Sequence, residues 1–202
     1  MRAKLISWMM EVSSEFALRR ETLHNAVIML DKWLGKTENF SKNHLQLLAL
    51  GCLFICSKIE ELYPPTAANF AFTANNFFSE VEIKNIERNI CKKLNWNLVQ
   101  VTPNKVFGCL SQAWDNLISL KSEAKEISAE PSLLQFRQKS KESYHLFSEA
   151  TQLLDCIICH PGYLQMSIDI FVLAVMQVVL CSRLSSLESA EEEIETIFGD
   201  FS

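Results

Sequence analysis

One apolar stretch constrains the fold of this chain more than any other feature. From Leu47 to Cys56 no side chain is polar, so a helix formed here is apolar on every face. Such a helix is buried among other helices rather than laid on a surface. The run is too short to cross a membrane, which takes about 20 apolar residues. We therefore expect a central core helix, with Ser41 as its N-cap and Pro64-Pro65 stopping it.

The end of this helix carries charges that a generic core does not explain. Lys58, Glu60 and Glu61 follow the apolar run. Lys58 suits the negative end of the helix dipole, whereas each exposed carboxylate costs roughly 0.3–1 kcal/mol there. Two interpretations are open: a solvated helix end with a Lys58–Glu61 pair, or a charged site made for a partner.

The composition favours long helices in a soluble, intracellular protein. The chain has 202 residues, 49% of them hydrophobic, and only 5 Gly and 5 Pro, which fits helices better than a β-sandwich. The formal net charge is −5, and no basic patch or Arg-rich run suggests binding to nucleic acid. No signal segment or membrane span is visible. The cysteines in apolar patterns are expected to be buried, reduced thiols: Cys52, Cys56, Cys91, Cys109 and Cys181.

Helical periodicity predicts further helices around this core. In the first half they cover residues 1–18, 22–34, 69–72 and from Ser79 onward, where Ser79 and Glu82 match a capping box. In the second half, Thr102-Pro103 predicts a helix start. The expected helices there are 102–118, 131–160, 164–184 and a last acidic one from 186 or 189 to 198, with a loop over 119–130. We expect two helical halves, each around one apolar helix.

Four charged residues fall where the periodicity predicts core-facing positions. Asp31 lies on the apolar stripe of its helix and needs a partner, for which Arg2 is the candidate. The alternative is that Asp31 lies at the edge of the stripe, in water. Glu87 falls inside another apolar stripe. Together with Lys58 it provides the unlike charges that a satisfied buried pair or a shared docking site requires.

Four motifs in the first half resemble those of the cyclin family. In order, they resemble its MRAILxxWLxEV, ETLxxAV, SKxEExYPP and LxFxL signatures: Met1–Val12, Glu21–Val27, Ser57–Pro65 and Leu94–Leu98. The second half matches only in helical layout and length. Cyclin E is the nearest type and cyclin A the second, from three further matches: Thr37-Glu38-Asn39, Trp96 and Leu153-Leu154-Asp155.

The resemblance implies an all-α double cyclin fold with about five helices in each bundle. Residues 1–98 would be the N-terminal cyclin box and residues 99–202 the C-terminal cyclin fold. Only four helices are expected in the second, so its last helix would be missing, short or trimmed. The implied function is a regulatory subunit, not an enzyme, that allosterically activates a cyclin-dependent kinase in cell-cycle control. The nucleus and cytoplasm are the expected compartments. No cofactor, metal, nucleic acid or membrane is expected to bind.

The resemblance also implies two binding surfaces and one internal ion pair, Arg2 with Asp31. The kinase-binding residues are Lys58, Ile59, Glu61, Glu87, Trp96 and Leu98. A docking groove for R-x-L peptides of substrates and inhibitors is formed by Met1, Leu5, Trp8, Glu11, Leu45 and Gln46. A stripe of Leu and Trp on a helix more often packs in the core of a protein. The resemblance to the family instead implies that this stripe binds peptides. Lys4 stands where the family has an apolar residue, so the groove is expected to be less apolar.

The sequence also contains a motif that resembles a haem-attachment site. Residues 156–160 (CIICH) fit the C-x-x-C-H pattern of haem attachment. Neither an exporting compartment nor a second axial ligand is signalled, so core cysteines are expected rather than a haem or zinc site. No phosphate loop, G-x-S-x-G elbow or H-E-x-x-H motif supports an enzyme. A transcription-type cyclin-box protein and a non-catalytic helical scaffold are the alternative functions.

Overall fold

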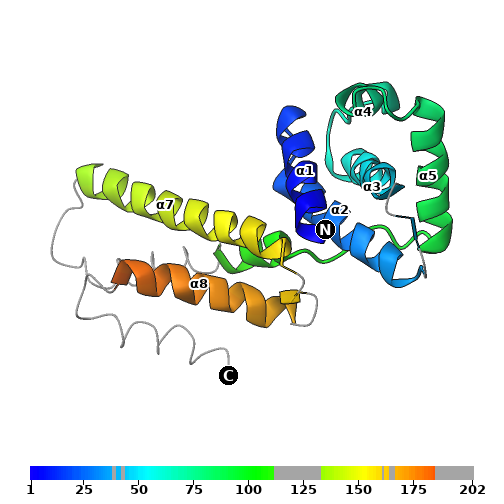
Figure 1. The fold of residues 1–202 in the computed structure, drawn as a ribbon. Coiled ribbons are helices and arrows are strands. Elements are labelled where there is room, and N and C mark those ends of the chain that lie inside the picture. Colours follow the sequence, from blue (N-terminus) through cyan, green and yellow to red (C-terminus); the bar gives the residue numbers. More distant parts are fainter. Residues whose placement is uncertain (38–39, 42–43, 112–132, 161, 164–166, 185–202) are drawn as a thin grey trace. The chain divides into compact units, whose positions relative to one another are not determined.

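The computed structural model contains helices and no strand in the part of the chain that it describes (Figure 1). That part comprises residues 1–37, 40–41, 44–111, 133–160, 162–163 and 167–184. The predicted all-α class is therefore confirmed. The chain divides into two compact units: Met1–Asn104 with Ile158–Pro161, and Lys105–Ile157 with Gly162–Ser202. Residues 99–104 are grouped with the first unit. The boundary of the cyclin box between residues 98 and 99 stays a prediction.

The first unit is built around one buried helix. Figure 1 shows α3 (Leu45–Glu60) enclosed by the other helices of this unit. These helices are α1 (Arg2–Glu15), α2 (Arg20–Gly35), α4 (Ala67–Thr73) and α5 (Glu80–Lys93). Every residue of α3 from Leu47 to Ser57 is buried, which confirms the prediction from the apolar run.

The start of α3 differs from the prediction. The N-cap is His44, and it makes no side-chain capping hydrogen bond. Ser41 acts only through its backbone carbonyl, which accepts from the His44 N–H at 3.1 Å. The prediction of Ser41 as N-cap is therefore wrong: a short turn separates it from the helix. At the other end the helix stops before Pro64-Pro65, and Glu61 is already extended.

Gly51 allows α5 to approach α3 closely. A Cβ atom at this position would lie 2.8 Å from Cγ2 of Ile86 and 2.9 Å from Cδ1 of Ile90. The start of α5 is fixed by the predicted capping box. The Ser79 N–H donates to the Glu82 carboxylate at 2.8 Å, and the Glu82 N–H donates to the Ser79 hydroxyl at 3.3 Å. The register of α5 against α3 thus follows from a cap and a glycine.

An ion pair joins the start of α1 to α2. The Arg2 Nε and Nη2 atoms donate to the two carboxylate oxygens of Asp31 at 2.9 and 2.7 Å. Nη1 donates to the backbone carbonyl of Cys159 at 3.0 Å. The Asp31 side chain is only 8% exposed, so the alternative position in water is not what the structure shows. The forked contact gives this carboxylate the charged partner that its burial requires.

Glu21 holds the segment that follows α5. Its side chain is buried, with 8% of the residue exposed. Its carboxylate accepts from the Thr102 hydroxyl and, at 3.2 Å, from the Asn104 amide. A helix begins at Pro103, as Thr102-Pro103 predicts. No local pattern indicates this role for Glu21, because the contact joins residues more than 80 positions apart in the chain.

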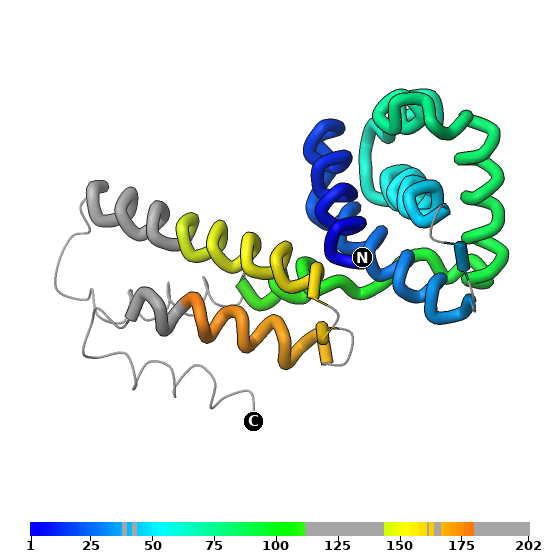
Figure 2. Tube along the Cα trace, in the orientation of Figure 1, coloured from blue at the N-terminus to red at the C-terminus, as the bar shows by residue number. Residues whose placement is uncertain are grey.

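The second unit has its own apolar core. Its described helical residues are 105–111, α7 (Leu133–Ile158) except its last residue, and α8 (Ile168–Leu184). In Figure 2, α7 and α8 run side by side, and they share one cluster: Phe107, Ala150, Leu154, Phe171, Val172, Val175 and Val179. No helix in the described ranges is long and apolar enough to cross a membrane. The loop 119–130, the last acidic helix and the Cys181 side chain lie outside the described residues.

The close approach at Gly51 predicts a specific loss of stability. Gly51→Ala gains up to about 1 kcal/mol of helix propensity. The new methyl overpacks against branched Ile86, which costs about 1–3 kcal/mol. We expect a lower free energy of unfolding, measured with urea. Gly35→Ala is the matched control, because nothing lies within 4 Å of its Cβ position, and it should be neutral or stabilising. Equal stability of the two variants would contradict the close packing.

The Arg2–Asp31 pair predicts a larger loss when only one partner is removed. Arg2→Ala leaves a carboxylate buried without its guanidinium partner, which costs about 2–4 kcal/mol. The double variant Arg2→Met/Asp31→Leu removes both charges and should recover at least half of that loss. Urea unfolding of the three variants measures both effects. An Arg2→Ala protein as stable as the unmodified chain would contradict the structural role.

Candidate functional site

Lys58 and Glu87, the two unlike charges that the sequence places at core-facing positions, meet at the surface. The Lys58 ammonium at the end of α3 forms an ion pair with Oε1 of Glu87 on α5. The two side chains are 39% and 23% exposed. The ammonium also lies 4.1 Å from the ring centroid of Phe54, within reach of a cation–π interaction. The structure thus brings the two residues together as a pair at the surface, not in the core.

Apolar side chains follow each member of this pair. Ile59 comes directly after Lys58 and is 40% exposed, and Trp96 comes after α5 and is 73% exposed. Leu98 is half-buried and packs against the first core. Lys58 and Ile59 therefore lie at the end of α3, Glu87 lies within α5, and Trp96 follows the end of α5. Exposed aromatic side chains are enriched at protein interfaces.

The backbone fixes the position of Trp96. The Trp96 N–H donates to the Cys91 carbonyl at 2.9 Å, and the Asn95 N–H donates to the Lys92 carbonyl at 3.1 Å. These two bonds form a Schellman motif, with Asn95 in the left-handed region at φ 51°. The chain therefore turns sharply at the end of α5, and the indole is carried outside the core.

Glu61 does not pair with Lys58. Its Oε1 atom accepts from the Arg19 backbone N–H at 2.8 Å and from the Thr22 hydroxyl. Arg19 is the N-cap of α2 and has no capping side chain of its own, so Glu61 supplies the carboxylate that a helix N-terminus favours. The interpretation of a Lys58–Glu61 pair is wrong. The assignment of Glu61 to the kinase surface stays a prediction.

The candidate docking residues lie on two helices that pack together, α1 and α3. On α1, Leu5 and Trp8 are half-buried against the core, whereas Lys4 and Glu11 are exposed. Met1, the N-cap of α1, is 72% exposed. At the start of α3, Leu45 is half-buried and Gln46 is exposed. Each of these side chains is at least partly accessible to solvent. That they form one groove together stays a prediction.

The cysteines divide into buried and exposed groups. Cys52, Cys56 and Cys91 are buried as expected, and burial raises the pKa of the Cys52 and Cys91 thiols, which keeps them protonated. Cys109 and Cys156 are exposed, so the expectation of core cysteines is wrong for both.

Helix geometry explains the exposed cysteines. Cys109 and Cys156 each follow a buried residue, Phe107 or Leu154, by two positions, which turns them about 200° away from the core. Cys159 is half-buried and His160 is exposed. Among the residues that the structure describes, no three His, Cys, Asp or Glu side chains are grouped to hold a metal ion.

Comparison with known proteins identifies the first half. The family model "Cyclin, N-terminal domain" matches residues 1–99. G1/S-specific cyclin-E1 of Danio rerio is 33% identical over 176 residues, which are 87% of this chain and 39% of that protein. G1/S-specific cyclin-E of Drosophila melanogaster is 38% identical over 102 residues, 50% of this chain and 14% of that protein. The chain spans less than half the length of these relatives.

A solved structure supports the fold. The X-ray structure of a viral cyclin from herpesvirus saimiri matches with a TM-score of 0.70 at 20% sequence identity, over 90% of this chain and 69% of that one. At this identity the likeness establishes the fold alone, and it confirms the predicted cyclin fold. The resemblance to cyclin E is confirmed by the sequence relatives. With a cyclin N-terminal domain over residues 1–99 and these relatives, the chain belongs to the cyclin family.

Proposed function

We propose that this chain is a regulatory subunit that binds and allosterically activates a cyclin-dependent kinase in cell-cycle control. The relatives named above are G1/S-specific cyclins, which supports a role in the cell cycle. Action in the nucleus and cytoplasm is part of the same proposal. The observation that carries the proposal is the partly exposed Lys58–Glu87 pair, with exposed Ile59 next to Lys58 and exposed Trp96 after the end of α5. The kinase would supply all of the catalysis.

The Lys58–Glu87 pair suits exchange with a partner. A surface ion pair contributes only about 0–1 kcal/mol to stability, so separating it for new contacts costs little. In the proposed complex Lys58 donates to, and Glu87 accepts from, polar groups near the C-helix of the kinase. Ile59, Trp96 and Leu98 pack against that helix.

The proposed activation is a shift between two kinase conformations. The C-helix of a protein kinase carries a Glu that must pair with the Lys holding the ATP phosphates. A partner that binds one orientation of this helix more tightly shifts the population toward it. The surface formed by the end of α3, by Glu87 on α5 and by the residues that follow α5 would favour the orientation in which that Glu and Lys meet.

The double variant Lys58→Ala/Glu87→Ala tests this proposal. We expect kinase affinity to fall at least about tenfold, because both charge-assisted contacts are lost. Calorimetry with a purified cyclin-dependent kinase measures the affinity, and histone phosphorylation measures activation. The helical circular dichroism should not change, because the pair lies at the surface.

A matched control removes the same charges elsewhere. Glu15→Ala/Lys36→Ala deletes one exposed acid at the end of α1 and one exposed base at the C-cap of α2, and it should bind and activate the kinase normally. Unchanged activation by Lys58→Ala/Glu87→Ala would contradict the kinase surface. Absence of kinase binding by the unmodified chain would favour the helical scaffold or the transcription-type protein.

A second proposed function is recruitment of R-x-L substrates and inhibitors by the α1 face. It is supported by Leu5 and Trp8, which are partly accessible on one side of α1, with exposed Glu11 one turn further on. In this proposal Glu11 accepts from the Arg of the peptide, and the apolar pair holds its Leu. Lys4 is exposed on the same helix, and its charge would disfavour peptides rich in basic residues.

Calorimetry with an R-x-L peptide tests the groove. Trp8→Ala should weaken binding at least about tenfold, since aromatic anchors dominate such contacts. Because Trp8 also packs against the core, Glu11→Gln is the second variant, and it should weaken binding several-fold without a change in stability. Glu15→Gln, exposed one turn later on α1, is the control. Equal affinities of Trp8→Ala, Glu11→Gln and the unmodified chain would remove this site.

A further inference from the structure

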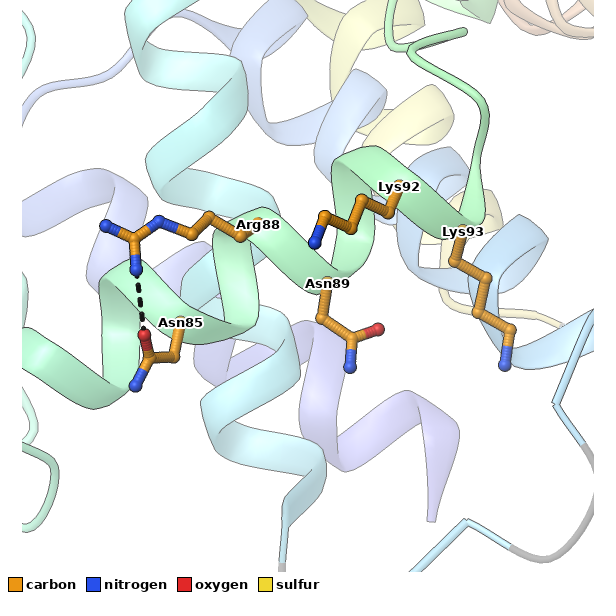
Figure 3. Close-up of a pocket in the computed structure, with 5 residues that line it drawn as sticks. All are labelled: Asn85, Arg88, Asn89, Lys92 and Lys93. Atoms are coloured by element: carbon orange, nitrogen blue, oxygen red, sulfur yellow. Dashed lines mark hydrogen bonds between the residues drawn. The ribbon is translucent and has the colours of Figure 1, made fainter.

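A basic pocket lies on the outer face of α5, away from the core. Figure 3 shows the residues that line it, here called the α5 basic pocket: Asn85, Arg88, Asn89, Lys92 and Lys93. The first four recur at i, i+3, i+4 and i+7, so they share one side of the helix. All four are exposed, whereas Ile83 and Ile90 on the opposite side are fully buried.

The prediction that the chain has no basic patch is wrong for this face. The cations are separated in the sequence by asparagine and buried apolar residues, so no basic run marks them. Only the helical arrangement brings Arg88, Lys92 and Lys93 to one pocket. No acidic side chain lines this pocket.

The three cations of the pocket have no acidic partner among the described residues. The Arg88 Nη1 atom donates to the Asn85 side-chain oxygen at 3.1 Å. The Lys93 ammonium donates to the Thr37 hydroxyl and lies 4.4 Å from the ring centroid of Trp33. Elsewhere on α5 the charges are paired, as in Lys84 with Glu80 at 3.4 Å. The positive charge of the pocket is therefore left uncompensated.

The hydrogen bond between Arg88 and Asn85 also sets the chemistry of the pocket. A side-chain amide presents one acceptor oxygen and two donor hydrogens. Because Arg88 occupies the oxygen of Asn85, the amide retains its N–H donors. Lysine ammonium and arginine guanidinium groups are donors only. The pocket is thus rich in N–H donors and positive charge, which is the complement of an oxyanion.

We propose that the α5 basic pocket binds the phosphate group of a phosphorylated peptide segment. A phosphate ester carries a charge of about −1.5 to −2 near neutral pH and three strong acceptor oxygens. Arg88 provides the fork that suits two of these oxygens. Lys92 lies one helical turn further, about 6 Å along the axis, so both can contact one tetrahedral group. Lys93, held against Trp33, lies at the rim as a preorganised charge.

A single phosphate fits the charge distribution better than a long polyanion. The positive pocket is limited to about two and a half turns of α5, from Asn85 to Lys93. The chain as a whole has a formal net charge of −5, which repels an extended nucleic acid. The residues that line the pocket lie about 100–160° around α5 from Glu87, so the proposal does not depend on kinase binding there.

A phosphopeptide titration tests the pocket. The probe is a Gly-Ser peptide with one phosphoserine, compared with the same peptide without phosphate and with inorganic phosphate. Amide signals of the unmodified chain are followed by NMR. We expect the phosphorylated peptide and inorganic phosphate to shift signals around Arg88 and Lys92, and the unphosphorylated peptide to leave them in place. Binding should weaken from about 50 to about 300 mM NaCl because salt screens exposed charges.

Charge-removal variants decide whether this pocket holds the phosphate. Arg88→Gln/Lys92→Gln should weaken phosphopeptide binding about tenfold, since two charge-assisted contacts are lost. Arg88→Lys, which keeps the charge but not the fork, should show a smaller loss. Lys4→Gln/Arg20→Gln removes two exposed cations on α1 and α2 and should stay within about twofold of the unmodified chain.

Three results would overturn the proposal. The first is equal affinity for the phosphorylated and unphosphorylated peptides. The second is an equal loss of affinity in Arg88→Gln/Lys92→Gln and in the control, which would indicate attraction by net charge alone. The third is tighter binding of an oligothymidine of about ten nucleotides through the same signals, which would make the pocket a nucleic-acid surface. Because every substituted side chain is exposed, unchanged circular dichroism is expected throughout.

Discussion

The burial of α3 on every side is the constraint on which the first unit depends. Leu48, Leu50 and Leu53 point in different directions around this helix, and all are fully buried, so each neighbouring helix must turn an apolar face to it. Only the ends of α3 can then reach a partner. Gln46 at one end and Lys58 at the other are about 18 Å apart along a rigid axis. The proposed docking groove and the proposed kinase surface would therefore be held at a fixed separation.

Three carboxylates connect the segments around this core. Asp31 binds Arg2 at the start of α1, Glu61 caps the start of α2, and Glu21 accepts from Thr102. Each lies in one segment and satisfies donors of another, where an unsatisfied donor would be costly. Residues in the motifs that resemble the family thus stabilise the chain on its own. Glu61 caps a helix although the resemblance implies a binding role for it.

Local sequence patterns predicted the helices well, whereas most contacts between residues far apart in the chain could not be predicted. The apolar run and the capping box at Ser79 are local signals, and both are confirmed. The periodicity predicts a first helix over residues 1–18, whereas α1 ends at Glu15. It ends in a Schellman motif, with the Leu18 N–H donating to the Ser13 carbonyl at 2.8 Å and Ala17 at φ 50°. Alanine gives no such stop signal, whereas glycine would. The contacts of Glu61 could not be predicted, because they depend on how α3 meets α2.

The arrangement of α5 shows how one helix can carry several chemistries without conflict. Each residue turns the side chain by 100°, so Ile83 and Ile90 face the core, Glu87 reaches Lys58 at the edge, and Arg88 and Lys92 point outward. Surface charges contribute little to stability, so the outer residues can vary while the packing at Gly51 stays intact. The turn that ends α5 orders the backbone of Trp96 before any partner binds. Ordering a group on binding costs free energy, so for Trp96 this cost is limited to the side chain. A helix packed this tightly on one side is a rigid platform for whatever its other sides recognise.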